Sequence, residues 1–114
     1  MRKTFGIPAE RIERLVPAMG WCYASDHITV EGRLVGYLYR EAPDSEGDSG
    51  WRFLSGAEDQ AYVDNPENFE IYDVNTIANY DRSIIPLLNE EPPCAFERLA
   101  EGEWSRSSLP EKSD

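Results

Sequence analysis

The only histidine of the chain, His27, follows a serine and an aspartate, and hydrolases use these three residue types for nucleophilic catalysis. A relay of this kind works only when the three side chains meet in space. Ser25, Asp26 and His27 are consecutive, and consecutive side chains of an extended segment point to alternate faces. A three-histidine metal site would also need further histidines. We therefore expect His27 to be a surface or capping residue.

The stretch from Asp44 to Gly50, DSEGDSG, carries acids at alternate positions, as the start of a calcium-binding loop does. An EF-hand loop also needs a glycine at its sixth position and a bidentate glutamate at its twelfth. Those positions hold Ser49 and Ser55 here. We therefore interpret the stretch as a solvated acidic loop, and we expect neither a metal site nor a cofactor.

No other residues show the spacing of a catalytic site. The cysteines, Cys22 and Cys94, have neither a Cys-x-x-Cys spacing nor a neighbouring histidine. The glycines are scattered singly, so no loop could cradle a phosphate. Close carboxylate pairs are expected by chance in so acidic a chain. We assign no catalytic residue and predict that the protein is not an enzyme. Both cysteines read as small core residues, and the sequence leaves open whether they meet.

The charge of the chain restricts its partners. There are 22 acidic residues against 11 Lys and Arg residues, which gives a formal net charge of -11 in 114 residues. Such a surface repels nucleic acids and anionic membranes, since both are polyanions, and it attracts a basic partner. The alternative is that the acidity only keeps the protein soluble. A chain of this length forms one domain.

The N-terminal residues do not resemble a secretory leader, because Arg11, Glu13 and Arg14 interrupt any apolar run. No stretch of about 18 apolar residues exists that could cross a membrane as a helix. We therefore expect a cytoplasmic protein whose thiols stay reduced.

The elements that would position the polar residues are mostly short strands. The predicted extended runs lie at residues 21–26, 27–31, 33–40, 51–54, 69–73 and 94–98. Gly36, in the middle of one of them, indicates a bulge or a close backbone approach. Because most connections are short, we predict an α+β fold, an antiparallel sheet of about five strands with short helices packed on one side.

Helical patterns are fewer. Apolar residues recur at helical spacing from Ile12 to Met19, which predicts a helix over residues 9–16 that ends before Pro17. Ser55 is expected near the N-cap of a helical turn at residues 57–62, and Asp73 is expected to cap a helix over residues 74–80. Residues 83–89 should form a buried turn.

The domain organisation that we expect has three parts. Residues 1–19 form an N-terminal helical extension, residues 20–104 form a single α+β domain, and the polar residues 105–114 form a disordered tail.

Four runs of the sequence carry a family resemblance. They are ASDHITVEGRLVGYLYREAPDSEGDSGWRF with SG one residue later, then YDVNTIANYD, IIPLL and AFER. Across residues 20–104 the chain resembles a family of small bacterial domains of unknown function related to the immunity protein thirty-three domain of polymorphic toxin systems. The resemblance implies an immunity role, the blocking of a toxin, and the family pattern includes no catalytic residue.

The positions that match the family pattern are Trp51, Arg52, Phe53, Ser55, Gly56, Tyr72, Asp73, Thr76, Ile77, Asp81 and Leu87. We expect the aromatic and aliphatic ones to be core residues. We also expect Arg52 to form an internal ion pair with Asp73 or Asp81.

Two functions remain open at this point. The first is an immunity-type inhibitor that binds a basic toxin protein through electrostatic steering. Its expected contact residues are Asp44, Glu46, Asp48, Glu58, Asp59, Asp64 and Glu67. The second is a cytosolic regulatory domain that binds a small ligand or forms a homo-oligomer. Exposed aromatic residues such as Tyr37 and Tyr39 would support the second.

Overall fold

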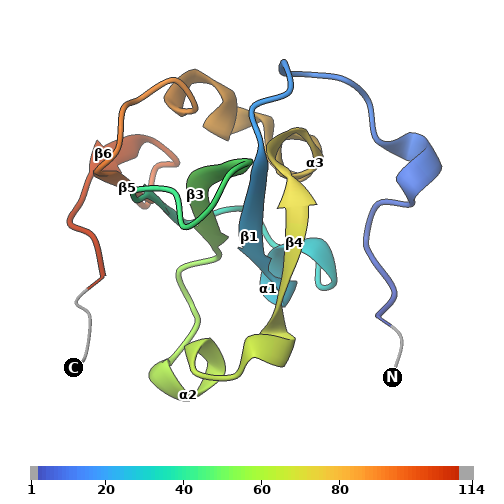
Figure 1. Ribbon diagram of the computed structural model, residues 1–114. Helices are drawn as coiled ribbons and strands as arrows, with labels where there is room; N and C mark the ends of the chain where they lie inside the picture. The colour runs from blue at the N-terminus through green and yellow to red at the C-terminus, as the bar shows by residue number, and fades with distance from the viewer. Residues whose placement is uncertain (1–2, 111–114) are drawn as a thin grey trace.

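A computed structural model of the protein describes residues 3–110, which fold around a six-stranded sheet of order β4-β1-β3-β2-β5-β6 (Figure 1). The strands are β1 (Trp21–Ser25), β2 (Tyr37–Arg40), β3 (Asp48–Leu54), β4 (Phe69–Asp73), β5 (Cys94–Arg98) and β6 (Trp104–Arg106). The helical segments are η1 (Ala9–Arg11), α1 (Asp26–Thr29), α2 (Gln60–Val63), η2 (Pro66–Asn68), α3 (Val74–Tyr80) and η3 (Arg82–Leu87).

The sheet is mixed rather than antiparallel. β1 pairs in parallel with β3, whereas the other four pairings are antiparallel. The α+β class is as predicted, but the strand count and the purely antiparallel arrangement are not. The additional strand is β6, and the arrangement differs because residues 26–36 form α1 and a loop instead of extended strands. This longer connection lets the chain skip one strand position, and β3 then fills the gap between β1 and β2.

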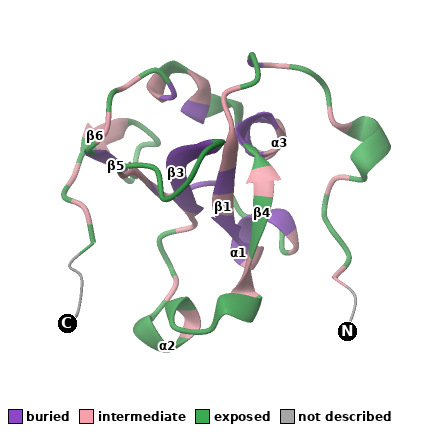
Figure 2. Ribbon diagram, in the orientation of Figure 1, coloured by how far each residue is buried: buried purple, intermediate pink, exposed green. Residues whose placement is uncertain are grey.

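Short helices cover one face of the sheet. The buried residues of α1 and α3, together with Ile84 of η3, pack against buried residues of β1, β2 and β3. Trp51 and Phe53 of β3 are fully buried there, with their rings stacked 6.0 Å apart. Figure 2 shows that buried residues gather in β3, α1 and α3, while α2 is largely exposed. The helical segments α1, α3 and η3 therefore pack on one side of the sheet, as predicted.

Side-chain caps decide where the helices begin. Asp73 accepts a hydrogen bond from the backbone N–H of Asn75 at 2.9 Å, so the predicted cap of α3 is confirmed. Ser25 caps α1 in the same way, which explains why residues 26–29 are helical and not extended. Asp59 caps α2, so the expected helical turn starts later than predicted and Ser55 is not its cap.

The predicted helix over residues 9–16 is reduced to the single 3-10 turn η1. The side chain of Asn75 holds the following residues in an extended conformation: its Oδ1 accepts from the N–H of Leu15 and Val16, and its Nδ2 donates to the Glu13 carbonyl. Val16 is buried as a result. The apolar spacing of this segment therefore reflects contact with the core and not helical periodicity.

The predicted close approach at Gly36 is confirmed, although the strand that follows starts only at Tyr37. A Cβ atom at Gly36 would collide with the Ser55 carbonyl oxygen. The N–H of Gly36 donates to the Leu54 carbonyl and its own carbonyl accepts from Arg98, so the residue joins the ends of three strands.

The cysteines do not meet. Cys22 lies on β1 and Cys94 on β5, with β3 and β2 between them, and both are free, buried thiols. Burial raises the pKa of both thiols, which disfavours thiolate chemistry.

The expectation that residues 105–114 form a disordered tail is wrong for the first residues of this segment. Residues 105 and 106 belong to β6, which pairs with β5, and the N–H of Ser107 donates to the Ala95 carbonyl. Residues 107–110 form no helix or strand, and the last part of the expected tail, residues 111–114, lies outside the described residues. Within residues 3–110, no helix has the length and apolar character needed to cross a membrane.

Candidate functional site

The face of the sheet opposite α1 and α3 is only partly covered, and we call it the open face. Side chains alternate along each strand, so the neighbours of the buried Cys22, Leu38 and Phe53 point to this side. Most of them are aromatic or aliphatic. The apolar members are Trp21, Tyr23, Tyr37, Tyr39, Leu54, Phe69 and Ile71.

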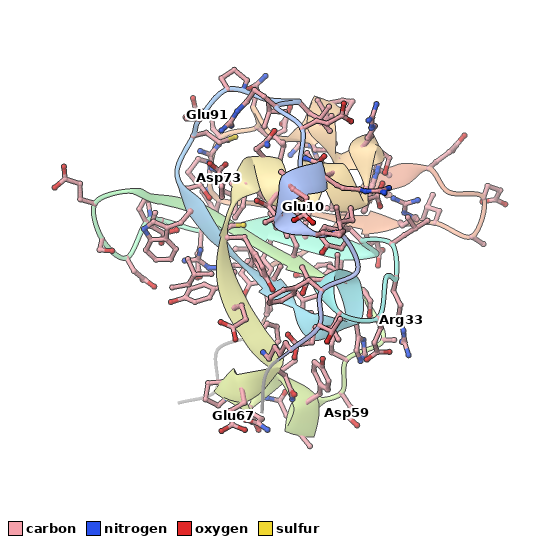
Figure 3. All side chains as sticks on the ribbon, turned by 90° about the vertical axis from the view of Figure 1, so that its right-hand side faces the viewer. Glu10, Arg33, Asp59, Glu67, Asp73 and Glu91 are labelled. Atoms are coloured by element: carbon pink, nitrogen blue, oxygen red, sulfur yellow. The ribbon has the colours of Figure 1, made fainter. Side chains whose placement is uncertain are left out.

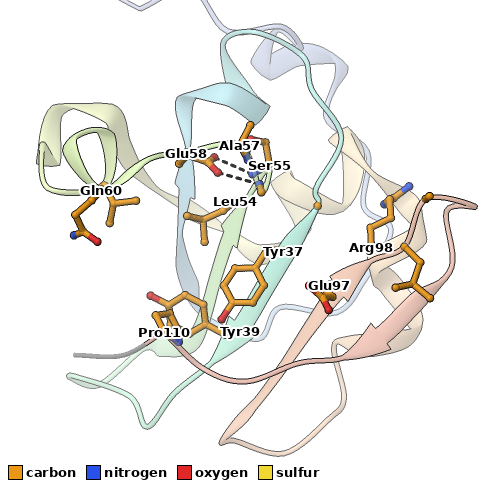
Figure 4. A pocket seen from close by; sticks show the side chains of 15 residues that line it. Tyr37, Tyr39, Leu54, Ser55, Ala57, Glu58, Gln60, Glu97, Arg98 and Pro110 are labelled. Atoms are coloured by element: carbon orange, nitrogen blue, oxygen red, sulfur yellow. Dashed lines mark hydrogen bonds between the residues drawn. The ribbon is translucent and has the colours of Figure 1, made fainter. Parts of the chain in front are cut away.

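Two adjoining hollows form a groove across the open face. The larger has a volume of about 760 Å³ and the smaller about 400 Å³, and both are lined by Tyr39, Leu54 and Val63. Figure 4 shows the larger hollow, with Tyr37 and Tyr39 projecting from β2 and Gln60 facing them from α2. The groove thus lies between the sheet and the α2 segment, and its sides are largely apolar.

Arg52 lies beneath the smaller hollow and is held by acids. Its guanidinium donates to both carboxylate oxygens of Asp48, at 2.9 and 2.8 Å, and its Nε donates to Glu41 at 3.0 Å. The guanidinium carbon lies 4.8 Å from the ring centroid of Tyr23. The side chains of Arg52 and Asp48 are 5% and 0% exposed. This is a charged cluster built into an apolar surface, and it fixes the floor of the groove.

The cluster shifts the titration of its members. Hydrogen bonds from Arg52 hold the pKa of Asp48 at about 2, below the ordinary value, although burial alone would raise it. Burial and the neighbouring Glu41 raise the pKa of the Tyr39 phenol. Asp48 is therefore ionised and Tyr39 is neutral at physiological pH.

His27 lies at the other end of the groove and is buried, so the expectation of a surface residue is wrong. Its Nδ1 lies 2.8 Å from the Ser55 hydroxyl and 3.4 Å from a carboxylate oxygen of Glu58. Glu58 in turn accepts from the N–H of Ser55 and Gly56 at 2.8 and 2.9 Å. Serine and carboxylate thus approach the same ring nitrogen, and the carboxylate nearest the other nitrogen, that of Glu31, lies 3.9 Å from Nε2, beyond hydrogen-bond distance, whereas a catalytic relay holds the ring through both nitrogens. The cluster fastens the 55–58 turn to α1.

The acids expected to contact a partner fall into two groups. Asp44, Glu46, Asp59, Asp64 and Glu67 are exposed. Asp48 and Glu58 are turned inward, with side chains 0% and 1% exposed and internal hydrogen-bond partners. Burial removes these last two from any contact surface. Figure 3 shows Asp59 and Glu67 together at one end of the molecule, with Glu91 at the other end.

Most residues of the family pattern are buried or half-buried, whereas Gly56 and Asp73 are exposed. Trp51, Phe53 and Ile77 are fully buried in the core, and the Tyr72 hydroxyl donates to Thr29. Gly56 has a positive φ of 93°, which favours glycine. The predicted pairing of Arg52 with Asp73 or Asp81 is wrong. Asp73 caps α3 and lies 3.8 Å from Arg14.

Asp81 has another set of partners at the helical side of the sheet. Its carboxylate accepts from the N–H of Val35 and from Ser83, and it forms an ion pair with Arg98. It is 6% exposed, so this carboxylate joins the loop before β2 to η3 and β5. Thr76 and Leu87 are half-buried.

The remaining groove residues could not be predicted from local sequence patterns. Tyr23 and Phe69 come from the paired strands β1 and β4, and Val63 comes from α2; they share a hollow with Tyr39 of β2 across the intervening strand β3. The alternation in residues 37–40 did place Tyr37 and Tyr39 on one face. Glu41 could have been recognised as the first acid after that strand.

The C-terminal segment borders the same groove. The Tyr37 hydroxyl donates to the Ser108 carbonyl at 2.7 Å, and Pro110 lines the larger hollow. Figure 4 shows Pro110 close to the ring of Tyr39. The segment after β6 therefore forms one side of the groove.

Among residues 3–110, no group of three or more His, Cys, Asp or Glu side chains is arranged to hold a metal ion. Searches of curated proteins and of solved structures gave no match. The profile of the immunity protein Imm33 domain, in contrast, matches residues 22–108, from β1 to just beyond β6. This range includes the whole sheet except Trp21, the first residue of β1. The chain therefore belongs to the Imm33 immunity protein family.

Proposed function

We propose that the protein is a non-catalytic immunity-type inhibitor that binds a cognate toxin protein through the open face of its sheet. The observation that carries the proposal is the groove of half-buried aromatic residues on that face, in a chain of the Imm33 family. Within residues 3–110, α2 borders the groove through Gln60 and Val63, but no helix covers Tyr39, Leu54 and Ile71 as α1 and α3 cover the opposite side.

The chemistry of this face suits a protein partner. The centres of protein interfaces are enriched in tyrosine, tryptophan and phenylalanine, which supply apolar area together with polar tips. Ile71 on β4 is 57% exposed and Val63 on α2 is 42% exposed, so the groove is bordered by apolar side chains in contact with solvent. A bound partner would remove this area from water, which is favourable.

The charge of the chain favours a basic partner. Asp44 lines the smaller hollow, Glu46 follows on the same loop and Glu67 lies in η2 next to the lining residue Pro66; all three acids are exposed, within a chain of formal net charge -11. A field of this sign accelerates the encounter with a positively charged protein and repels anionic competitors. A toxin that acts on nucleic acid carries such a basic surface, because it must bind phosphates.

A growth assay tests the proposal. Genes that neighbour the gene of this protein are expressed singly in a host cell, with and without this protein. We expect one of them to arrest growth and its arrest to be relieved by this protein, with the two proteins then purifying together in equal amounts. If no neighbouring product is both toxic and neutralised, the immunity role is rejected.

Association kinetics test these three acids separately. The triple charge reversal Asp44→Lys, Glu46→Lys and Glu67→Lys should slow association with the toxin about tenfold or more at low salt, and the difference should shrink as salt screens the charges. The matched control reverses three acids, Glu10, Glu91 and Glu103, which are exposed and line neither hollow. If both sets of substitutions slow association equally, the net charge of the protein and not the position of these acids accounts for the steering.

The size of the larger hollow also allows a second function. A volume of about 760 Å³ lies in the range of small-molecule sites, so the groove would suit a ligand as well. Sedimentation of the pure protein and a thermal-shift screen separate these cases. A dimer at nanomolar concentration, or a ligand that raises the melting temperature without any toxin, would favour the regulatory alternative.

A further inference from the structure

We propose that the smaller hollow of the groove binds one cationic side chain of the partner, an arginine, between the rings of Tyr23 and Tyr39 and against the carboxylates of Glu41 and Asp44. This inference rests on the proposed function, because it names the group of the partner that this part of the groove receives.

The first argument is the local charge. One guanidinium, that of Arg52, faces three carboxylates, those of Asp48, Glu41 and Asp44. Asp48 already binds Arg52 through both oxygens, so this pair is neutral by itself. Glu41 uses one oxygen, Oε2, toward Arg52, and Asp44 stands 3.7 Å from it. The cluster therefore carries a formal charge of -2 beside the hollow, which a partner's cation would reduce.

The second argument is exposure. The side chain of Arg52 is 5% exposed, whereas those of Glu41 and Asp44 are 26% and 73% exposed. The positive member of the cluster and its partner Asp48 are thus buried, whereas the other two carboxylates, those of Glu41 and Asp44, are accessible to solvent. A cation that approaches from solvent meets carboxylates first.

The third argument is the aromatic lining. Tyr23, Tyr39 and Phe69 line the hollow, and Tyr23 already stacks on one guanidinium at 4.8 Å. Ring faces attract cations, and a planar guanidinium combines this contact with a forked hydrogen bond to a carboxylate. An ammonium group lacks this planar shape, so the site favours arginine.

A direct experiment uses small probes and the full chain. Amide shifts of the isotope-labelled protein are followed by NMR while N-acetyl-arginine methylamide is added, and the neutral isostere N-acetyl-citrulline methylamide serves as the control probe. We expect saturable shifts centred on residues 23, 39, 41 and 44, with a dissociation constant on the order of 1–10 mM, typical of a single exposed ion pair with a ring contact. The citrulline probe should cause no saturable shift.

Two variants make the outcome specific. Asp44→Asn removes a carboxylate at the hollow, and Glu91→Gln removes the same charge at an exposed residue outside the groove. We expect the first to weaken binding of the arginine probe about fivefold and the second to leave it unchanged. Equal effects of both variants, equal binding of citrulline, or shifts centred elsewhere would overturn the inference.

The experiment is independent of the proposed function, since it needs no toxin. If this protein neutralises a toxin but does not bind the arginine probe, the immunity function is supported and the smaller hollow is rejected as the arginine site. If the protein binds the arginine probe but neutralises no toxin, the arginine site is supported and the immunity role is rejected.

Discussion

Arg52 and Asp48 form a two-bond ion pair within a single strand, β3, with their side chains almost completely buried. The residues are four apart, and Gly50 between them has a positive φ of 86°. A Cβ atom at Gly50 would collide with the Glu41 carbonyl oxygen. The irregular start of β3 thus brings a carboxylate and a guanidinium together beneath the groove.

Breaking this pair should destabilise the fold strongly. Arg52→Leu leaves the Asp48 carboxylate buried without its partner, and loss of one member of a buried pair costs roughly 3–5 kcal/mol. Unfolding in urea measures the change. The control is Arg82→Leu, which removes an ion pair with Glu13 whose side chains are 66% and 68% exposed. That change should be small, and similar losses in both variants would contradict the assignment.

Stability should fall between about pH 4 and pH 2, in part because of Asp48. Its pKa in the folded protein is about 2, below the ordinary value near 4, so the folded state binds fewer protons than the unfolded state in this interval. The stabilisation is complete above the unfolded pKa and is lost as the pH falls through the folded pKa. A shift of this size corresponds to roughly 2 kcal/mol.

The test of this pH dependence is Asp48→Asn. The variant should be less stable at neutral pH, and its free energy of unfolding should change less between pH 4 and pH 2 than that of the unmodified protein. The exposed Glu46→Gln serves as the control and should keep the original profile. An identical acid slope in Asp48→Asn would show that other carboxylates cause the decline.

The N-terminal segment should be released when Asn75 is replaced. Asn75→Ala removes an amide that binds the backbone of Glu13, Leu15 and Val16, and it leaves buried backbone groups without partners. We expect a loss of roughly 2–3 kcal/mol, with faster hydrogen exchange of the N–H groups of residues 15 and 16.

The matched control for Asn75 is Asn79, one turn later on α3. Its amide also binds the backbone of Glu13, but at an exposed position. Asn79→Ala should therefore cost well under 1 kcal/mol and leave exchange at residues 15 and 16 slow. Equal exchange in both variants would show that Asn75 does not hold the segment.

Helices and strands that are determined by interactions between residues close in the sequence could be predicted from the sequence. Asp73 caps α3 because its own side chain reaches the N–H two residues on, and this pattern can be read in the sequence. Strands β1, β4 and β5 were placed within a residue or two for the same reason. The segment after η1 was misread because its partner, Asn75, is some 60 residues away.

The candidate site was harder to predict than the strands. Acid counts identified Asp44 and Glu46 as exposed, but they could not distinguish these from Asp48, whose side chain is 0% exposed. That distinction depends on Arg52 and on the turn at Gly50. The groove depends on the order of the strands, and a strand inserted between two earlier ones leaves no local trace in the sequence.

Gly36 should not tolerate a side chain. Gly36→Ala places a methyl group against the Ser55 carbonyl, where three strand ends meet, and we expect a loss of roughly 1–3 kcal/mol. Gly6→Ala is the control, since its nearest neighbours would lie at 3.5 and 3.6 Å, ordinary contact distances. Thermal unfolding compares the two, and a Gly36→Ala protein as stable as Gly6→Ala would show that the strand ends can move apart.

Val63→Asp should separate binding from folding. Val63 lines both hollows and is 42% exposed, so an aspartate there adds a charge to the apolar groove while it removes little buried area. We expect a melting temperature within a few degrees of the original, and at least a tenfold loss of affinity for the neutralised toxin, because the charge must be desolvated on binding. Leu34→Asp makes the same change at a residue that is 56% exposed and lines neither hollow. Full protection of the host by Leu34→Asp and none by Val63→Asp would assign toxin binding to the open face, whereas full protection by both would place it on another surface.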